Sequence, residues 1–411
     1  MYALGLLGLA AQCALVFARP AKYQWDFGTY FYASQLFTKG QDPYDFEALV
    51  RLGTSSGAHG DKLNPFIYPV HALLWFLPLG ELSYHAAYYV YLALKIAAGI
   101  ILLIVAREWI NGPWWRALTP IFALLMFGGA VPSDLRTGNV ALFEATLVLV
   151  SFALLQRGRP GAFTFFIVLA SSFKTALLPL MTAPLVVRAR RRWLATTVAA
   201  SALPILLLIS WFAAPGLSRS FLHASGGLVD GLRPRAPRGA LNASSLRILA
   251  DICYLVGGNA NLLATGICYV AWVLVILSLG VYAWYKFDCD DRVLVRNEPV
   301  ALMYLLLTYG LLVPRLTQYS YTIMIIPCMF ALCRARRRWL TWAIVCFACV
   351  PFYFIRRDLF NVDPLSPAVS FALLPLEYSN FLVLLACWSL MTFAPRSTCV
   401  RATARNPATR T

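Results

Sequence analysis

The sequence predicts an all-α protein that crosses a membrane many times, and three observations carry this prediction. Hydrophobic residues make up 60% of the 411 residues and charged residues only 13%, whereas a soluble domain carries about 25% charged residues. Apolar stretches of roughly 17 to 25 residues, the length that spans a bilayer, recur along the chain. Short basic runs separate these stretches. We therefore expect a polytopic transmembrane helical protein with about 10–12 membrane helices and outer-face loops, and a globular enzyme with a large soluble core is excluded.

The positive charge of the chain follows the pattern of a membrane protein. The net charge is +17, from 35 lysines and arginines against 18 acidic residues. The basic residues lie in short runs at residues 157–159, 188–192 and 334–338 and in the tail 396–410, and such runs mark cytoplasmic loops. They also suit contacts with anionic membrane lipids. The charge thus indicates orientation in a membrane, and no nucleic-acid partner is expected.

The apolar stretches define the expected spans in order. Residues 2–17 are expected to be an uncleaved signal anchor, because no small-residue cleavage site precedes Arg19 and Pro20. Residues 66–82 are apolar but interrupted by Pro69 and Pro78, which favours an interfacial or re-entrant segment. Further spans are expected at residues 84–106, 114–131, 139–156, 193–213, 262–286, 300–313, 319–333, 340–354 and 369–393.

Residues 160–187 are expected to form two short helices or a re-entrant hairpin. Arg157 and Arg159 precede this stretch and the basic run 188–192 follows it. If both ends are cytoplasmic, an even number of crossings separates them. Lys174 then falls near the turn, displayed toward the outer side. The alternative is a single span with a lysine at its centre, which costs about 3 kcal/mol or more.

A cytoplasmic N-terminus would place every basic run inside. Residues 19–65, 132–138, 215–261, 314–318 and 356–368 would then form outer loops. Residues 1–395 are expected to form one membrane domain, and residues 396–411 a basic cytoplasmic tail. No internal repeat stands out, so the inverted-repeat signature of many transporters is missing.

Asp26 is the first candidate for chemistry, because it follows the first apolar stretch closely and is therefore held near the outer surface. A carboxylate there can accept a proton from a sugar hydroxyl. The alternative is that Asp26 is a solvated acid in a loop, near Lys22. The Asp42-Pro43-Tyr44 segment favours a turn. Tyr68 and the tyrosines of residues 84–91 suit either an aromatic belt or a sugar-binding face.

Lys174 and Arg315 are the basic residues that stand out. A lysine at membrane depth is a functional hypothesis by default, and a cation among hydroxyls suits a lipid phosphate; the alternative is a lysine that snorkels to the interface. Arg315 lies on a very short outer loop, and a guanidinium binds phosphate with two hydrogen bonds. We also expect an ion pair between Asp134 and Arg136 within the loop 132–138.

The ten cysteines and four histidines do not indicate a metal or redox centre. Most cysteines lie within or beside apolar stretches, and even the CxxC of Cys346 and Cys349 lies inside one, so they are best explained as small buried hydrophobes. The histidines have no metal-ligand spacing. No metal and no cofactor are expected.

In their order along the chain, these segments resemble glycosyltransferase family 87, the polyprenol-phosphate-mannose-dependent α-mannosyltransferases of the GT-C class. The resemblance covers about residues 20–330 and rests on Asp26 with Tyr30; Gly40 and Asp42-Pro43-Tyr44; Tyr68-Pro69 followed by Pro78; Gly138-Asn139; Arg157-Gly158-Arg159; Lys174 with Pro179; Arg191-Arg192-Trp193; Asn242 with Ser244; and Pro314-Arg315 with Tyr319. There is one departure: the family often has Gly-Gln before the Asn-bearing helix, and here Thr137-Gly138-Asn139 lacks the Gln.

The resemblance implies a GT-C-like fold and an inverting transfer of a sugar, mannose above all, from a polyprenyl-phosphate donor to a lipid or glycan acceptor. By that resemblance Asp26 is the general base, and Lys174 and Arg315 hold the leaving lipid phosphate. The implied substrate-binding residues are Tyr30, Asp42, Tyr44, Tyr68, Asn139, Asn242 and Tyr319. The implied place is a bacterial inner membrane, with the active site on the periplasmic or extracellular face.

Other functions stay open at this point. A transporter or flippase of lipid-linked saccharides would need polar residues along a midplane path, and in the spans Lys174, Lys95 and Glu144 are the main examples. An assembly partner without activity would tolerate the loss of Asp26. Within the enzyme class, the donor could carry arabinose or another pentose or hexose.

Overall fold

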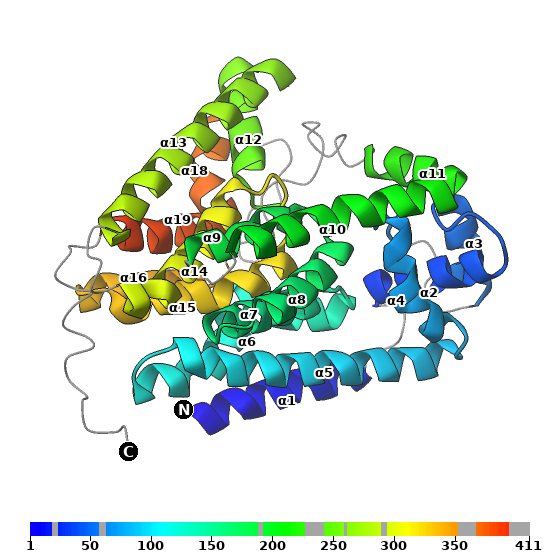
Figure 1. Cartoon of the computed structure of the whole chain (residues 1–411), viewed down its shortest axis with the longest axis horizontal. Coiled ribbons are helices and arrows are strands. Elements are labelled where there is room, and N and C mark those ends of the chain that lie inside the picture. The colour runs from blue at the N-terminus through cyan, green and yellow to red at the C-terminus, as the bar shows by residue number, and fades with distance from the viewer. Residues whose placement is uncertain are drawn as a thin grey trace.

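The computed structural model describes residues 1–18, 24–56, 63–187, 192–226, 242–258, 261–288, 294–351 and 367–393, and these residues form helices and no β-strand (Figure 1). The predicted all-α membrane fold is confirmed. Within the described part of the chain, four helices are long and apolar enough to cross a membrane, namely α5, α6, α10 and α13, and eight shorter apolar helical segments have 10–17 residues.

The first half of the chain forms α1 (Tyr2–Ala18), α2 (Trp25–Thr38), α3 (Phe46–Ser55), the 3₁₀ helix η2 (Val70–Ala72), α4 (Leu73–Gly80), α5 (Tyr84–Trp109), α6 (Pro113–Thr137), α7 (Ala141–Gln156), α8 (Pro160–Phe173), the 3₁₀ helix η3 (Thr175–Thr182) and α9 (Ala183–Val186). The second half forms α10 (Arg192–Ala213), α11 (Pro215–Gly226), α12 (Ser245–Gly257), α13 (Leu262–Asp288), α14 (Leu294–Leu312), the 3₁₀ helix η6 (Gln318–Met324), α15 (Ile325–Arg334), α16 (Arg338–Cys349), α18 (Pro367–Glu377) and α19 (Ser379–Thr392).

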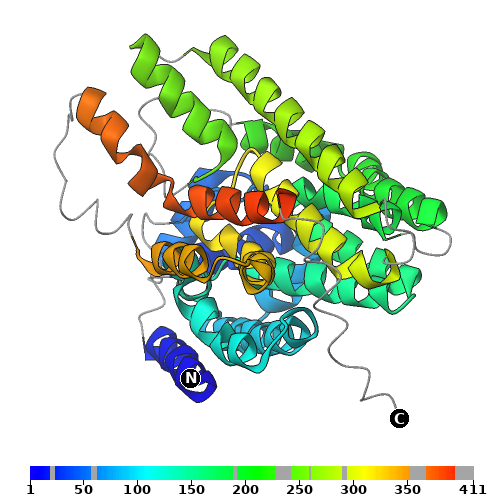
Figure 2. The same ribbon diagram turned by 90° about the vertical axis from the view of Figure 1, so that its left-hand side faces the viewer.

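Helix α7 lies in the core of the bundle, and α10 and α13 lie at its periphery. α7 packs against α5, α8 and η6, and its Ala145, Val148 and Phe152 have no exposed surface. Only 17% and 11% of the most apolar windows of α10 and α13 are buried. Figure 2 shows α12 and α13 side by side along one edge of the bundle. The outward apolar faces of α10 and α13 are what contact with lipid requires.

The short helices α2, α3, α4 and α11 gather at one end of the molecule, to the right in Figure 1 and far from the N-terminus. Within the outer loop expected at residues 19–65, the described residues therefore include two helices, α2 and α3. α3 begins where the Asp45 side chain accepts a hydrogen bond from the Ala48 amide at 3.0 Å, a typical N-cap. α2 packs against α3 and α4 and buries Phe27 and Phe31, so tertiary burial stabilises a helix that lacks the apolar length of a span.

Helix α6 ends at Thr137, so residues 132–137 are helical and the loop expected at residues 132–138 was wrong. The chain bends earlier instead, at residues 126–129, where Phe127, Gly128 and Gly129 have φ of 56°, 64° and 78°. Pro132 then lies in the first turn of the second half of α6, where proline is tolerated because its missing amide has no helical partner to lose.

Residues 66–82, which were expected to form an interfacial or re-entrant segment, contain the two short helices η2 and α4. Helix α4 packs against α2.

Two further expectations have opposite outcomes. Residues 160–187 divide as predicted: α8 ends at Phe173, Lys174 is extended (φ −138°, ψ 101°), and η3 begins at Thr175. Residues 369–393 were expected to form one span, which was wrong, because α18 and α19 are separate helices divided at Tyr378. The basic run 188–191 and the tail 396–411 lie outside the described residues.

Gly138 ends α6 at its closest approach to α2. Its φ is +74°, and a Cβ at this position would lie 2.6 Å from the Cβ of Phe27. Gly158, at the end of α7, has φ +70° but no atom within 4 Å of such a Cβ. The two glycines therefore separate the cost of a left-handed backbone from the cost of a steric clash.

We expect Gly138→Ala to lower the melting temperature more than Gly158→Ala does. Both substitutions carry the left-handed strain of about 1–2 kcal/mol, and Gly138→Ala adds the clash with Phe27. The measurement is thermal unfolding of the purified variants in detergent, followed by tryptophan fluorescence. Equal melting temperatures would show that α2 and α6 do not meet as described.

Candidate active site

Asp26 lies in the first turn of α2 and is 5% exposed. Its two carboxylate oxygens each accept one amide hydrogen bond: Oδ1 from Asn64 Nδ2 at 2.8 Å, and Oδ2 from Asn139 Nδ2 at 3.0 Å. The side chain is thus not the solvated loop acid of the alternative reading, and Lys22 lies outside the described residues. Two amides from distant parts of the chain hold this carboxylate in one orientation.

Asn64 is the residue of this centre that sequence reasoning missed. The Thr29 hydroxyl of α2 lies 2.8 Å from the Asn64 carbonyl oxygen and accepts from the Asn64 amide at 3.2 Å. Asn64 itself is exposed, so the Asp26 centre lies next to the protein surface at this point. An exposed asparagine before Pro65 carries no sequence signal, because its partner is 38 residues away.

Asn139 lies in the turn between α6 and α7 and brings the predicted tyrosines to the same centre. Its Nδ2 also donates to the Tyr30 hydroxyl at 3.3 Å, and its Oδ1 accepts from the Ala141 amide at 3.2 Å. The Tyr30 and Tyr68 hydroxyls share a hydrogen bond of 2.8 Å. Asp26, Tyr30, Tyr68 and Asn139, four of the predicted site residues, therefore form one hydrogen-bonded group.

Burial raises the pKa of Asp26 above its ordinary value, whereas hydrogen bonds from Asn64 and Asn139 and the charge of Lys95 lower it. The two groups of effects oppose each other because burial disfavours the carboxylate and the amide donors favour it. The net rise in pKa makes the Asp26 carboxylate a stronger base than that of an exposed aspartate, which is the direction that proton abstraction by a general base requires.

Asp134 pairs with Lys95 of α5 at 2.6 Å, and both side chains are at most 1% exposed. The expected ion pair between Asp134 and Arg136 was therefore wrong. The reason is the helix itself: α6 extends to Thr137, so residues two apart point to different sides. Asp134 turns into the core, and Arg136 turns toward a cavity on another side of α6.

Lys174 and Glu144 form a second charged pair beside η6. The Lys174 ammonium donates to the Ser320 hydroxyl at 2.9 Å and lies 3.6 Å from Glu144 Oε2. The Lys174 side chain is 27% exposed and that of Glu144 7%. Lys174 is thus a partly accessible cation with a buried counter-ion, not a lysine that extends freely to the interface. Sequence reasoning noted Glu144 only as a polar residue in a span.

The Asn242 segment holds the loop that carries Arg315. The Leu316 amide donates to Asn242 Oδ1 at 2.9 Å, and the Ser244 hydroxyl donates to the Pro314 carbonyl at 2.6 Å. Arg315 is exposed between these two anchors. The amide oxygen of Asn242 is therefore engaged with backbone, and its immediate effect is to position Arg315. Tyr319 follows in η6, next to the Ser320 that contacts Lys174.

Asp42 and Tyr44 support the centre from outside. The Asp42 carboxylate accepts from the Tyr44 amide at 2.9 Å and from the Ser220 hydroxyl of α11 at 2.6 Å. This is the turn that the sequence indicated. The Tyr44 hydroxyl donates to the Tyr68 carbonyl at 2.7 Å. The structure thus connects these two residues to the site through the backbone of Tyr68.

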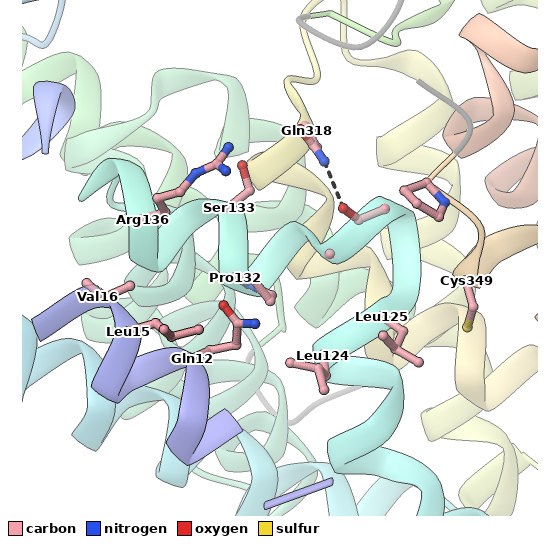
Figure 3. Close-up of a pocket in the computed structure, with 13 residues that line it drawn as sticks. Gln12, Leu15, Val16, Leu124, Leu125, Pro132, Ser133, Arg136, Gln318 and Cys349 are labelled. Atoms are coloured by element: carbon pink, nitrogen blue, oxygen red, sulfur yellow. Dashed lines mark hydrogen bonds between the residues drawn. The ribbon is translucent and has the colours of Figure 1, made fainter. Parts of the chain in front are cut away.

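A cavity of about 310 Å³ lies beside the bend in α6 (Figure 3). Its lining is Gln12, Leu15, Val16, Leu124, Leu125, Gly128, Gly129, Pro132, Ser133, Arg136, Gln318, Cys349 and Pro351. Most of these side chains are apolar, and Arg136 adds a charge. Gln318 of η6 donates to the Gly128 carbonyl at 3.0 Å. The cavity is therefore lined in part by α6, whose C-terminal end precedes Asn139 of the group around Asp26. Within the described ranges, no group of three or more His, Cys, Asp or Glu is arranged to hold a metal ion.

The comparisons with known proteins place the chain in a family. The model of glycosyltransferase family 87 matches residues 66–314, which is more than half of the 411 residues. No curated protein and no solved structure matches the chain. The matched region contains Tyr68, Asn139, Lys174 and Asn242, whereas Asp26 precedes it. The chain belongs to glycosyltransferase family 87 and is a membrane glycosyltransferase.

Proposed function

We propose that this glycosyltransferase moves a sugar, mannose above all, from a polyprenyl-phosphate donor to a hydroxyl of a lipid or glycan acceptor, with inversion at the anomeric carbon. The observation that carries the proposal is the buried Asp26 carboxylate, aligned by the amides of Asn64 and Asn139. A carboxylate held in this way has the geometry and the basicity for proton abstraction. The direct test is transfer of labelled mannose from polyprenyl-phosphate mannose to membrane lipid extracts by the purified protein.

In the proposed reaction Asp26 is the general base. Its carboxylate takes the proton of the acceptor hydroxyl as the acceptor oxygen forms a bond to the anomeric carbon from the face opposite the donor phosphate. The bond between the anomeric carbon and the phosphate oxygen breaks, and its electron pair leaves with the lipid phosphate. Tyr30, Tyr68 and Tyr319 are the nearby phenol groups proposed to bind the sugar, because their hydroxyls and rings suit its polar and apolar faces.

Lys174 is proposed to bind the leaving phosphate together with Arg315. The ammonium is held by Ser320 and Glu144, so it needs no reorganisation when charge develops on the phosphate. Arg315 is exposed on a loop that Asn242 and Ser244 anchor. The cavity beside the bend in α6 is proposed to take part of the polyprenyl chain, since its lining is mainly apolar. Fixed cations would supply the charge stabilisation, and no metal or other cofactor is proposed.

We propose that the Asp26 centre faces the periplasmic or extracellular side of a bacterial inner membrane. Support comes from the basic run 157–159, which marks a cytoplasmic end, and from the cluster of α2, α3, α4 and α11 at one end of the molecule. In a cysteine-free background, a membrane-impermeant thiol reagent should label Glu47→Cys in intact cells and label Arg159→Cys only after lysis. Both positions are exposed. Labelling of Arg159→Cys in intact cells would place the reaction on the other face.

We expect Asp26→Asn to reduce turnover by at least about 100-fold while donor binding stays near that of the parent. The amide keeps the shape of the carboxylate but cannot take a proton. Turnover and donor binding are measured on purified protein in lipid, with Glu47→Gln as the control, because Glu47 is an exposed acid of α3 to which no role in the site is assigned. Near-normal turnover of Asp26→Asn would remove the general-base role and would favour a transporter or an assembly partner.

Lys174→Met is expected to weaken donor binding and slow transfer, by about 2 kcal/mol or more, because a charge-assisted contact in a partly dry site is lost. Lys174→Arg should retain part of the activity, since the charge stays and the geometry changes. Glu144→Gln is the matched control: it removes the counter-ion of Lys174 but keeps the cation, so donor affinity should be kept or increased. If Lys174→Met binds and transfers like the parent, Lys174 is structural and the phosphate role passes to Arg315.

A further inference from the structure

We propose that Lys95 is a positioning residue of the transfer reaction: from the middle of α5 it holds the turn between α6 and α7 in the conformation that directs the Asn139 amide to Asp26. This inference rests on the proposed function of Asp26 as the general base. It assigns a catalytic purpose to a buried cation that neither touches the carboxylate nor lies near the surface.

The Lys95 ammonium meets three acceptors. Its Nζ lies 2.6 Å from Asp134 Oδ2, 2.8 Å from the Asp134 carbonyl oxygen and 2.6 Å from the Asn139 carbonyl oxygen. The ammonium thus makes one ion pair with the Asp134 carboxylate and donates two hydrogen bonds to backbone carbonyls. The side chain is 1% exposed, and no exchange with water competes with these bonds.

Charge neutralisation alone does not explain this arrangement. A lysine within a membrane helix is expensive and needs a counter-ion, and Asp134 supplies one. The other two contacts, however, are hydrogen bonds to backbone carbonyls: that of Asp134 in the last turn of α6, which also accepts from the Gly138 amide, and that of Asn139 in the turn that follows. A lysine side chain that binds such carbonyls holds the helix end and the residues that follow it.

The residue held in this way is Asn139. Its carbonyl oxygen accepts from Lys95 and, at 3.2 Å, from the Tyr91 hydroxyl. Its side-chain oxygen accepts from the Ala141 amide. The backbone and the side-chain oxygen of Asn139 are therefore both engaged, and Nδ2 remains to donate to Asp26 at 3.0 Å and to Tyr30 at 3.3 Å. Release of the carbonyl would let the turn rotate and would move this amide away from the carboxylate.

The test must separate positioning from plain stability, and a double variant does so. Lys95→Met/Asp134→Leu removes both buried charges together, and such replacements of a buried ion pair are often neutral for stability. It keeps the net charge around Asp26 unchanged but removes both donations to the backbone carbonyls.

The pH dependence of the reaction is read against all titratable and charged groups that face Asp26. These groups are Tyr30 of α2, Tyr68, Tyr91 and Lys95 of α5, Asp134 of α6 and Tyr319 of η6.

The measurement is kcat and KM against pH, with labelled polyprenyl-phosphate mannose as donor and membrane lipid extract as acceptor. We expect the double variant to fold with a melting temperature near that of the parent and to lose about 10- to 100-fold in kcat, the effect of a small displacement in an active site. The base must be deprotonated, and loss of an amide donor to the carboxylate raises its pKa. The acid limb of the kcat profile should therefore move up by about one pH unit. Parent kcat and an unmoved acid limb would overturn the proposal, because Lys95 would then serve only as the counter-ion of Asp134.

Tyr91→Phe is the second variant and changes no charge. The Tyr91 hydroxyl donates to the Gly138 and Asn139 carbonyls at 3.0 and 3.2 Å, so its removal should lower kcat by about fivefold, as expected for one hydrogen bond, and move the acid limb in the same direction. If the double variant does not fold and Tyr91→Phe behaves like the parent, the proposal fails. Arg116→Met is the control: Arg116 donates to the Ile110 carbonyl at the other end of α6, and its loss should leave kcat and the acid limb unchanged.

Asp26→Asn, assayed beside these variants, distinguishes failure of the general-base function of Asp26 from failure of the positioning role of Lys95. Parent turnover of Asp26→Asn would reject the general-base function itself. Loss of turnover in Asp26→Asn, together with parent behaviour of the double variant and of Tyr91→Phe, would reject only the positioning role of Lys95.

Discussion

The structure around the active centre depends on one contact, the hydrogen bond between the Asn139 amide and the Asp26 carboxylate. It joins two residues that are 113 positions apart, one in the first turn of α2 and one between α6 and α7. The contact requires the end of α6 to lie against α2, and Gly138 permits this because a side chain there would meet Phe27. The positions of Tyr30 and Tyr68 follow from it, since both hydroxyls are connected to Asn139 through hydrogen bonds.

Charge around the centre is arranged in buried or partly buried pairs. Lys95 with Asp134 and Lys174 with Glu144 are two such pairs, and they differ in access: the first is at most 1% exposed, whereas the Lys174 side chain is 27% exposed. In a medium of low polarity an unpaired charge is costly, so each cation needs its acid. Only the accessible pair can meet a substrate. The buried pair acts on the protein itself, which is why we assign the phosphate to Lys174 and the support of the turn to Lys95.

Exclusion of water strengthens the interactions of these few polar groups. Electrostatic interactions strengthen as water is excluded, and the Asp26 carboxylate is 5% exposed. Burial raises its pKa while two amides and a distant cation oppose the rise. The balance leaves a base that is stronger than an exposed aspartate and still held in one orientation. A general base beside a lipid substrate needs both properties.

The sequence by itself determined the class of the protein, its family and several of its site residues. Apolar stretches and basic runs report membrane helices because the solvent imposes length and charge placement on every span. The division of residues 160–187 at Lys174 followed from the same rule. The resemblance to glycosyltransferase family 87 selected Asp26, Tyr30, Tyr68 and Asn139, which the tertiary structure joins in one hydrogen-bonded group.

Only the tertiary structure decided which groups face one another. Asn64 and Lys95 gain their partners from segments 38 and 39 residues away, and Glu144 of α7 gains Lys174 from beyond α8. Local sequence patterns contain no information on contacts over such separations. The bend of α6 at residues 126–129 also escaped the sequence, because Pro132 was the more obvious break. Asp134 consequently faces Lys95 and not Arg136. Helical continuity sets where a side chain points, and packing between helices sets what it meets.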